Sequence, residues 1–181
     1  MPLRKCAKII KGSMALLILS ALTGVFAADD IVQLGQPVSE ADLRDWDLII
    51  MPDGSGLPEG AGSAVQGSAV YEQQCASCHG ASGKGMPGVP ALVGENNSAG
   101  EPVVRAVGNY WPSATTLFDY VRRAMPPTAP KSLSTEQVYQ VVAYVLFLND
   151  IIGEEHELTH NNLSTVDMPN RNGFVDRSQM Q

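Results

Sequence analysis

The stretch Cys75-Ala76-Ser77-Cys78-His79 organises the interpretation of this sequence. Two thiols three residues apart lie on the same side of a helix, and the histidine that follows can present its imidazole to a metal beside them. The pattern C-x-x-C-H is the attachment signature of c-type haem, in which the two thiols add to the two vinyl groups of one porphyrin. We therefore predict one haem c, bound covalently at Cys75 and Cys78 with His79 as an iron ligand.

Other chemistries also use paired cysteines. A structural disulfide or a thioredoxin-like redox pair would share the C-x-x-C spacing, but the redox pair needs a βαβ setting, and the sequence has no convincing strand pattern. A zinc site needs four ligands at matched spacing, and only His156 and His160 could complete one. These two histidines also spell H-E-x-x-H over residues 156–160. Because that segment is polar and no histidine or glutamate follows it, a catalytic zinc site is disfavoured.

Length and charge bound the remaining possibilities. The 181 residues carry a net charge of −7, which disfavours a nucleic-acid partner because such a partner attracts a basic face. Residues 1–27 have the features of a secretory signal, namely a basic start, an apolar stretch at 14–26 and a small residue before the expected cleavage at Ala28. A retained membrane anchor is the alternative, but the apolar stretch is short for a span. Cleavage would leave a periplasmic chain of 154 residues with a net charge of −11 and no membrane span.

The expected organisation is all-α. Residues 28–63 are rich in turn formers and are expected to form an arm on the domain, with a short helix at 39–47. A domain over residues 64–152 is expected to contain helices at 67–78, at 114–124, and after a capping box at Ser134–Gln137. Residues 153–181 are polar and rich in turns, so they are expected to form a tail.

A sixth iron ligand would distinguish an electron carrier from a haem enzyme. Met125 precedes two prolines and opens a stiff loop over residues 125–133 that could cross the second face of the haem. Met86 lies in the same loop as His79, whereas Met51 and Met168 lie in the arm and the tail. Two alternatives stay open, an ordinary core role for Met125 and a distal histidine from the 156–160 segment. The low aromatic content of 6% also fits a shell around a porphyrin, which supplies apolar surface itself.

The order of haem helix, Gly/Pro-rich loop, helix, Met-Pro loop and last helix over residues 64–152 resembles class I cytochrome c. This resemblance implies three main helices around one covalent haem. It assigns the thioether bonds to Cys75 and Cys78, the proximal position to His79 and the distal position to Met125.

The same resemblance implies roles for residues around the haem. The carbonyl of Pro90 would accept a hydrogen bond from the proximal imidazole, and such a bond fixes the tautomer of a ligating histidine. Leu92 would pack on the haem, and Trp111 would donate to a propionate. The arginines that could pair with a propionate are Arg105, Arg122 and Arg123. At the crossing of the first and last helices, the resemblance implies Gly67, Tyr71 and Tyr144.

A narrower resemblance extends into the arm and the tail. Segments at 52–54, 56–58, 110–112, 114–120, 122–126, 128–133 and 168–174 are similar to the cytochrome subunits of molybdenum sulfite dehydrogenases and of the Sox sulfane dehydrogenase. The larger Sox subunit carries two haems, whereas this sequence has one C-x-x-C-H. The resemblance thus implies a monohaem partner of a molybdenum dehydrogenase.

Taken together, these patterns predict a periplasmic carrier of single electrons. Its donor would be a molybdenum-containing dehydrogenase, and its acceptor a downstream cytochrome or oxidase. The alternatives are a general carrier without a dedicated partner and a haem enzyme that binds substrate at the iron, such as a peroxidase or a thiosulfate-oxidising cytochrome.

Overall fold

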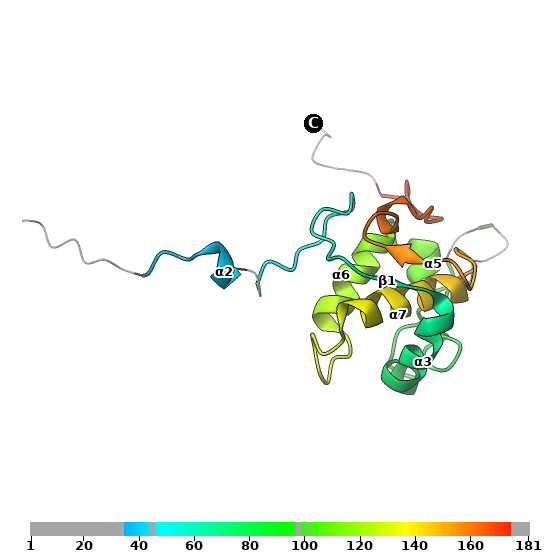
Figure 1. Cartoon of the computed structure of the whole chain (residues 1–181). Coiled ribbons are helices and arrows are strands. Elements are labelled where there is room, and N and C mark those ends of the chain that lie inside the picture. The colour runs from blue at the N-terminus through cyan, green and yellow to red at the C-terminus, as the bar shows by residue number, and fades with distance from the viewer. Residues whose placement is uncertain (1–34, 44–45, 97–98, 101, 175–181) are drawn as a thin grey trace, which may run out of the picture. The chain divides into compact units, whose positions relative to one another are not determined.

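The computed structural model describes residues 35–43, 46–96, 99–100 and 102–174, so the expected signal segment at 1–27 lies outside the described residues. The chain divides into two units at Ser39 and Glu40, and of the first unit the structure describes the exposed, irregular segment 35–39. The elements of the second unit are α2 (Glu40–Leu43), β1 (Ala61–Gly62), α3 (Ala64–Gln74), α4 (Ala76–His79), α5 (Val107–Tyr110), α6 (Ala114–Ala124), α7 (Thr135–Leu148), β2 (Leu158–Thr159) and the 3-10 helix η1 (Leu163–Thr165) (Figure 1).

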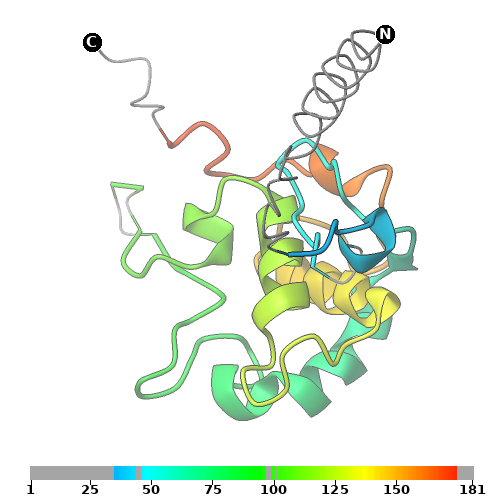
Figure 2. The same cartoon turned by 90° about the vertical axis from the view of Figure 1, so that its left-hand side faces the viewer.

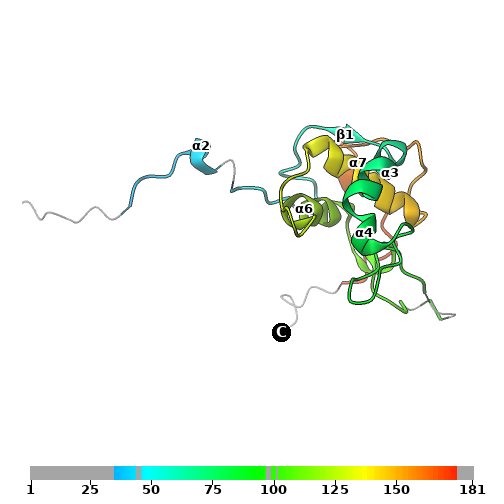
Figure 3. The same ribbon diagram turned by 90° about the horizontal axis from the view of Figure 1, so that it is seen from below.

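Helix α7 is the centre of the core. It packs against both α3 and α6, which are far apart in the sequence (Figures 2 and 3). Its buried residues are Val138, Tyr139, Val141, Val142, Ala143, Val145 and Leu146. This arrangement of three main helices confirms the expected all-α class I cytochrome c fold.

The crossing of α3 and α7 depends on one glycine. A Cβ atom built on Gly67 would lie 1.9 Å from the backbone oxygen of Gln140, so the two helices approach backbone to backbone at this point. The Tyr71 and Tyr144 rings pack beside the crossing, with their centroids 5.1 Å apart. These are the residues that the resemblance to class I cytochrome c implies at this crossing.

Local signals define α6 and α7. The hydroxyl of Ser134 accepts from the backbone N–H of Gln137 at 3.2 Å, and the Gln137 side chain accepts from the Ser134 N–H at 2.9 Å, so the predicted capping box is present. Helix α6 covers residues 114–124 as predicted and ends before Met125 and Pro126.

The helix that leads into the C-x-x-C-H motif differs from the prediction of one helix over residues 67–78. It begins earlier, at Ala64, because Ser63 is its N-cap residue and the Ser63 backbone N–H donates to the Gln66 side chain at 3.1 Å. It is then interrupted at Cys75, whose backbone leaves the helical region at φ −122° and ψ −39° before α4 resumes. The short helix expected at 39–47 is observed as α2 over four residues.

Two features of the structure were not anticipated from the sequence. No strand was expected, yet β1 and β2 form an antiparallel pair in which Ala61 faces Thr159 and Gly62 faces Leu158. Residues 153–181 were expected to form a polar, turn-rich tail, and the structure adds that four of its residues are buried in the same core as α6 and α7, namely Leu158, Leu163, Val166 and Met168. These four residues follow no helical or strand period, which is why the sequence pattern did not identify them.

Residues 50–58 of the arm are held by three contacts with the helices. The Ile50 N–H donates to Asp119 at 3.3 Å, Thr115 donates to the Pro52 carbonyl at 3.3 Å, and the Tyr139 hydroxyl donates to the Pro58 carbonyl at 2.8 Å. Among the described residues, no helix is both long enough and apolar enough to span a membrane.

Candidate functional site

One wall of a deep cavity is formed by the end of α3 and by α4. Cys75, Cys78 and His79 line it, and neither cysteine is in a disulfide. The backbone N–H groups of Cys78 and His79 both donate to the Cys75 carbonyl, at 3.1 and 2.9 Å. This tight turn brings the two thiols and the imidazole to the same cavity.

The His79 ring is oriented by the loop that follows it. Its Nδ1 atom lies 3.0 Å from the carbonyl oxygen of Pro90, which is the contact that the resemblance implies. The loop returns to this position because Leu92 and Val93 both donate to the Gly83 carbonyl, at 2.7 and 2.9 Å. With Nδ1 donating to Pro90, the imidazole offers Nε2 as its free ligand atom.

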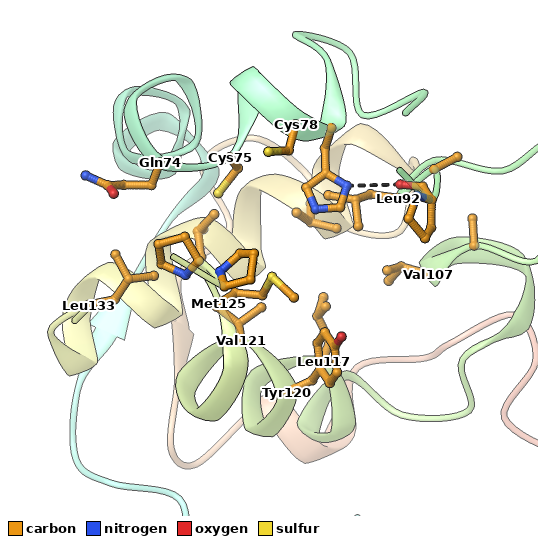
Figure 4. Close-up of a pocket in the computed structure, with 18 of the residues that line it drawn as sticks. Gln74, Cys75, Cys78, Leu92, Val107, Leu117, Tyr120, Val121, Met125 and Leu133 are labelled. Atoms are coloured by element: carbon orange, nitrogen blue, oxygen red, sulfur yellow. Dashed lines mark hydrogen bonds between the residues drawn. The ribbon is translucent and has the colours of Figure 1, made fainter. Parts of the chain in front are cut away.

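The opposite wall comes from α6 and the loop after it. Cys75 and Cys78 project from one side of the cavity, whereas Leu117, Val121 and Met125 project from the other (Figure 4). Pro126, Pro127 and Thr128 continue this second wall.

The cavity has about 330 Å³ of space, within the range of small-molecule and cofactor sites. Leu92 and Trp111, the two predicted haem neighbours, both line it. The Trp111 ring stacks edge-to-face on Tyr120, with the centroids 5.8 Å apart. All seven residues predicted for the site therefore surround one cavity, which is lined mostly by apolar groups.

The three arginines considered as partners of a haem propionate differ in their position relative to the cavity. Arg105 lines the cavity, whereas Arg122 and Arg123 do not, and Arg123 forms an ion pair with Asp119 on its own helix. The other lining residues that the sequence did not assign to the site are Gln74, Ser77, Ala91, Ala106, Val107, Leu117, Tyr120, Val121, Pro126, Pro127, Thr128, Leu133, Val141 and Val145. Val141 and Val145 are buried residues of α7 that also form part of the cavity wall.

The other methionines do not reach the cavity. Met51 and Met86 are about half exposed, at 51% and 50%, and Met168 is buried in the tail. Among the described residues, Met125 is therefore the methionine that lines the cavity.

The alternative metal and redox sites find little support. His156 and His160 are exposed, and β2 lies between them, so the H-E-x-x-H segment is not helical. Within the described part of the chain, no group of three His, Cys, Asp or Glu side chains could hold a metal ion. Burial, with a smaller effect of Cys78, raises the pKa of the Cys75 thiol to about 11. A redox-active C-x-x-C pair has a lowered pKa instead.

These residues fit a c-type haem. Two unpaired thiols and one oriented imidazole face an apolar cavity, and a thioether lies on its far side. Soft sulfur and imidazole ligands are those that hold haem iron in cytochromes c.

Comparison with known proteins agrees with this chemistry. The profile of the family described as cytochrome c oxidase, cbb3-type, subunit III matches residues 62–145. The structure is also similar to the sulfane dehydrogenase SoxCD from Paracoccus pantotrophus, with 35% sequence identity and a TM-score of 0.74. That match covers 83% of this chain and 75% of the SoxCD chain.

Proposed function

Because the chain belongs to the c-type cytochromes, we propose that it carries single electrons on one haem c, held covalently by Cys75 and Cys78 and ligated by His79 and Met125. The placement of Met125 across the cavity from the two cysteines is the observation that carries this proposal (Figure 4). A bound haem supplies a one-electron iron couple, and two protein ligands leave no open position for a substrate.

The chain's own residues would prepare this site. Pro90 holds the His79 ring in one tautomer through the 3.0 Å contact, which raises the basicity of the ligating nitrogen. Leu117, Val121 and Val145 line the cavity and would exclude water from a bound haem. An apolar surround and a thioether ligand both favour the ferrous state, so a raised potential is expected.

The Met125→Ala variant tests the ligation. The wild-type ferric protein should be low-spin and show the near-infrared sulfur-to-iron band. Met125→Ala should lose that band and bind cyanide readily, whereas the matched Met86→Ala variant should keep the wild-type spectrum, because Met86 lies outside the cavity. A high-spin wild-type spectrum would contradict the carrier and support a haem enzyme.

We further propose that the electron donor is a molybdenum-containing dehydrogenase of sulfur compounds and that the acceptor is a downstream cytochrome or oxidase. The similarity to SoxCD supports a donor of this class. The arm offers an apolar surface for docking it, since Trp46, Ile49 and Met51 are exposed at 80%, 60% and 51%.

Mixing the haem-loaded chain with a molybdenum sulfite dehydrogenase and sulfite tests this partner. Haem reduction should be rapid and should slow in Trp46→Ser, while Val65→Ser, at an exposed position on α3, should have no effect. Equal reduction rates with unrelated donors would favour a general carrier.

The periplasmic location rests on the proposed signal at residues 1–27. N-terminal sequencing of the exported protein should begin at Ala28. A retained N-terminus would instead indicate a membrane anchor.

A further inference from the structure

Three side chains connect the tail to the cavity. The ring of Phe174 packs edge-on against Tyr110, with centroids 5.2 Å apart and an interplanar angle of 68°. The guanidinium carbon of Arg105 lies 4.9 Å from the centroid of the same Tyr110 ring. Because Arg105 lines the cavity, the row Phe174–Tyr110–Arg105 runs from the tail to the proposed haem site.

The tail is anchored at this position. The side-chain amide of Asn170 donates to the Tyr110 carbonyl, and Met168 is buried with 1% of its surface exposed. Arg171 donates to the carbonyls of Ser164 and Val166, which fixes the turn before Phe174. Figures 1 and 2 show the tail passing beside α5, which carries Tyr110.

Arg105 places a positive charge at the wall of the cavity. It is the one lysine or arginine side chain among the cavity-lining residues that the structure describes. A haem carries two anionic propionates, and a planar guanidinium is well suited to bind a carboxylate. An exposed arginine has many rotamers, so a cation–π contact that restricts them lowers the entropic cost of that bond.

We propose that the tail segment 168–174 positions Arg105, through the ring of Tyr110, to bind a haem propionate and so raise the haem midpoint potential. A cation near the haem disfavours the ferric form, which carries one more positive charge than the ferrous form. Tyr110 and Phe174 are positioning residues, since they act through Arg105. The inference rests on the proposed haem site and is independent of the identity of the dehydrogenase.

Redox titration of the haem-loaded, full-length protein tests the proposal. Arg105→Gln should lower the midpoint potential, and Phe174→Ala should lower it by a smaller amount. The double variant should match Arg105→Gln alone, because Phe174 acts only through Arg105. Tyr110→Phe keeps the ring and should keep the wild-type potential, whereas Tyr110→Leu should lower it.

Lys84→Gln is the matched control. It also removes one positive charge, but Lys84 is exposed, is paired with Glu95 at 2.9 Å and does not line the cavity. Its potential should stay at the wild-type value. Phe174 is 52% exposed, so its replacement is compatible with folding, and thermal unfolding of each variant checks this.

Three results would overturn the inference alone. They are an unchanged potential in Phe174→Ala, a Phe174 effect that persists in full without Arg105, and an equal shift in Lys84→Gln. Purified wild-type protein without covalent haem would instead overturn the proposed function, and this inference with it.

Discussion

At the scale of single residues, the two proposed iron ligands differ in how firmly the protein holds them. His79 is bonded through its ring to Pro90, and its backbone accepts from Gly85 at 2.9 Å. Met125 follows the last turn of α6, with its N–H bonded to Val121 at 3.0 Å and a side chain of three rotatable bonds. The fold therefore fixes the orientation of the imidazole more tightly than that of the thioether.

Tyr139 gives the first prediction, on alkaline stability. Burial raises the pKa of its phenol to about 12, from an ordinary value near 10. The fold thus favours the neutral phenol. The resulting stabilisation is complete below about pH 10 and is lost as the pH rises from 10 towards 12.

The Tyr139→Phe variant should lose about 1 kcal/mol at pH 7, because it removes the bond to the Pro58 carbonyl. Its stability should then fall less steeply than that of the wild type above pH 10. A remaining decline is expected from Tyr71, whose pKa burial also raises to about 12. Urea unfolding at pH 7, 10 and 11.5 checks both statements, and parallel curves for the two proteins would contradict the second.

At the scale of elements, the α3–α7 crossing should be the most sensitive point of the fold. Gly67→Ala places a Cβ atom against the backbone of Gln140, which cannot move aside as a side chain could. We expect a loss of about 3 kcal/mol in the free energy of unfolding. Gly153→Ala is the control, because its Cβ would meet nothing within 4 Å, and it should be close to neutral in the same denaturation assay.

The elements also show which parts of the fold were predictable. Helices α6 and α7 were predicted well because their limits depend on local signals, the Met125-Pro126 stop and the Ser134 capping box. The β1–β2 pair was missed because it joins segments almost 100 residues apart and has only two residues in each strand.

The residues of the site also differ in how far the sequence could predict them. Cys75, Cys78 and His79 were predictable because a local motif carries their chemistry. Arg105 could be separated from Arg122 and Arg123 only in three dimensions, since what distinguishes it is which side of the fold it faces.

At the scale of the whole molecule, the tail belongs to the core. Met168 is buried beside Leu158 and Leu163, so Met168→Ala should cost about 2 to 4 kcal/mol through lost packing and a cavity. Met51→Ala removes the same side chain from an exposed position and should change stability by less than about 0.5 kcal/mol. Chemical denaturation of both variants measures the difference. If Met168→Ala lost as little stability as Met51→Ala, the buried tail residue would not stabilise the domain.

The cavity itself leads to the last prediction, on the protein without haem. Its walls come from α3–α4, from the loop carrying Pro90 and Leu92, and from α6 with the Met125 loop, while α7 contributes Val141 and Val145. Without a ligand, these apolar walls face a void or water, and the facing walls lose their packing. The helix contacts outside the cavity, above all the α3–α7 crossing, remain.

The Cys75→Ser/Cys78→Ser variant, purified without haem, should therefore retain much of its helical far-ultraviolet circular dichroism. It should lose near-ultraviolet signal, bind a hydrophobic dye, and unfold at a lower denaturant concentration and less cooperatively than the haem-loaded protein. The same variant with added free haem controls for the loss of the thioether bonds as such, and it should recover part of the stability, because a ligand that binds the folded state alone stabilises it. If the haem-free protein unfolded as cooperatively as the loaded one, and at the same midpoint, the haem would not be part of the core.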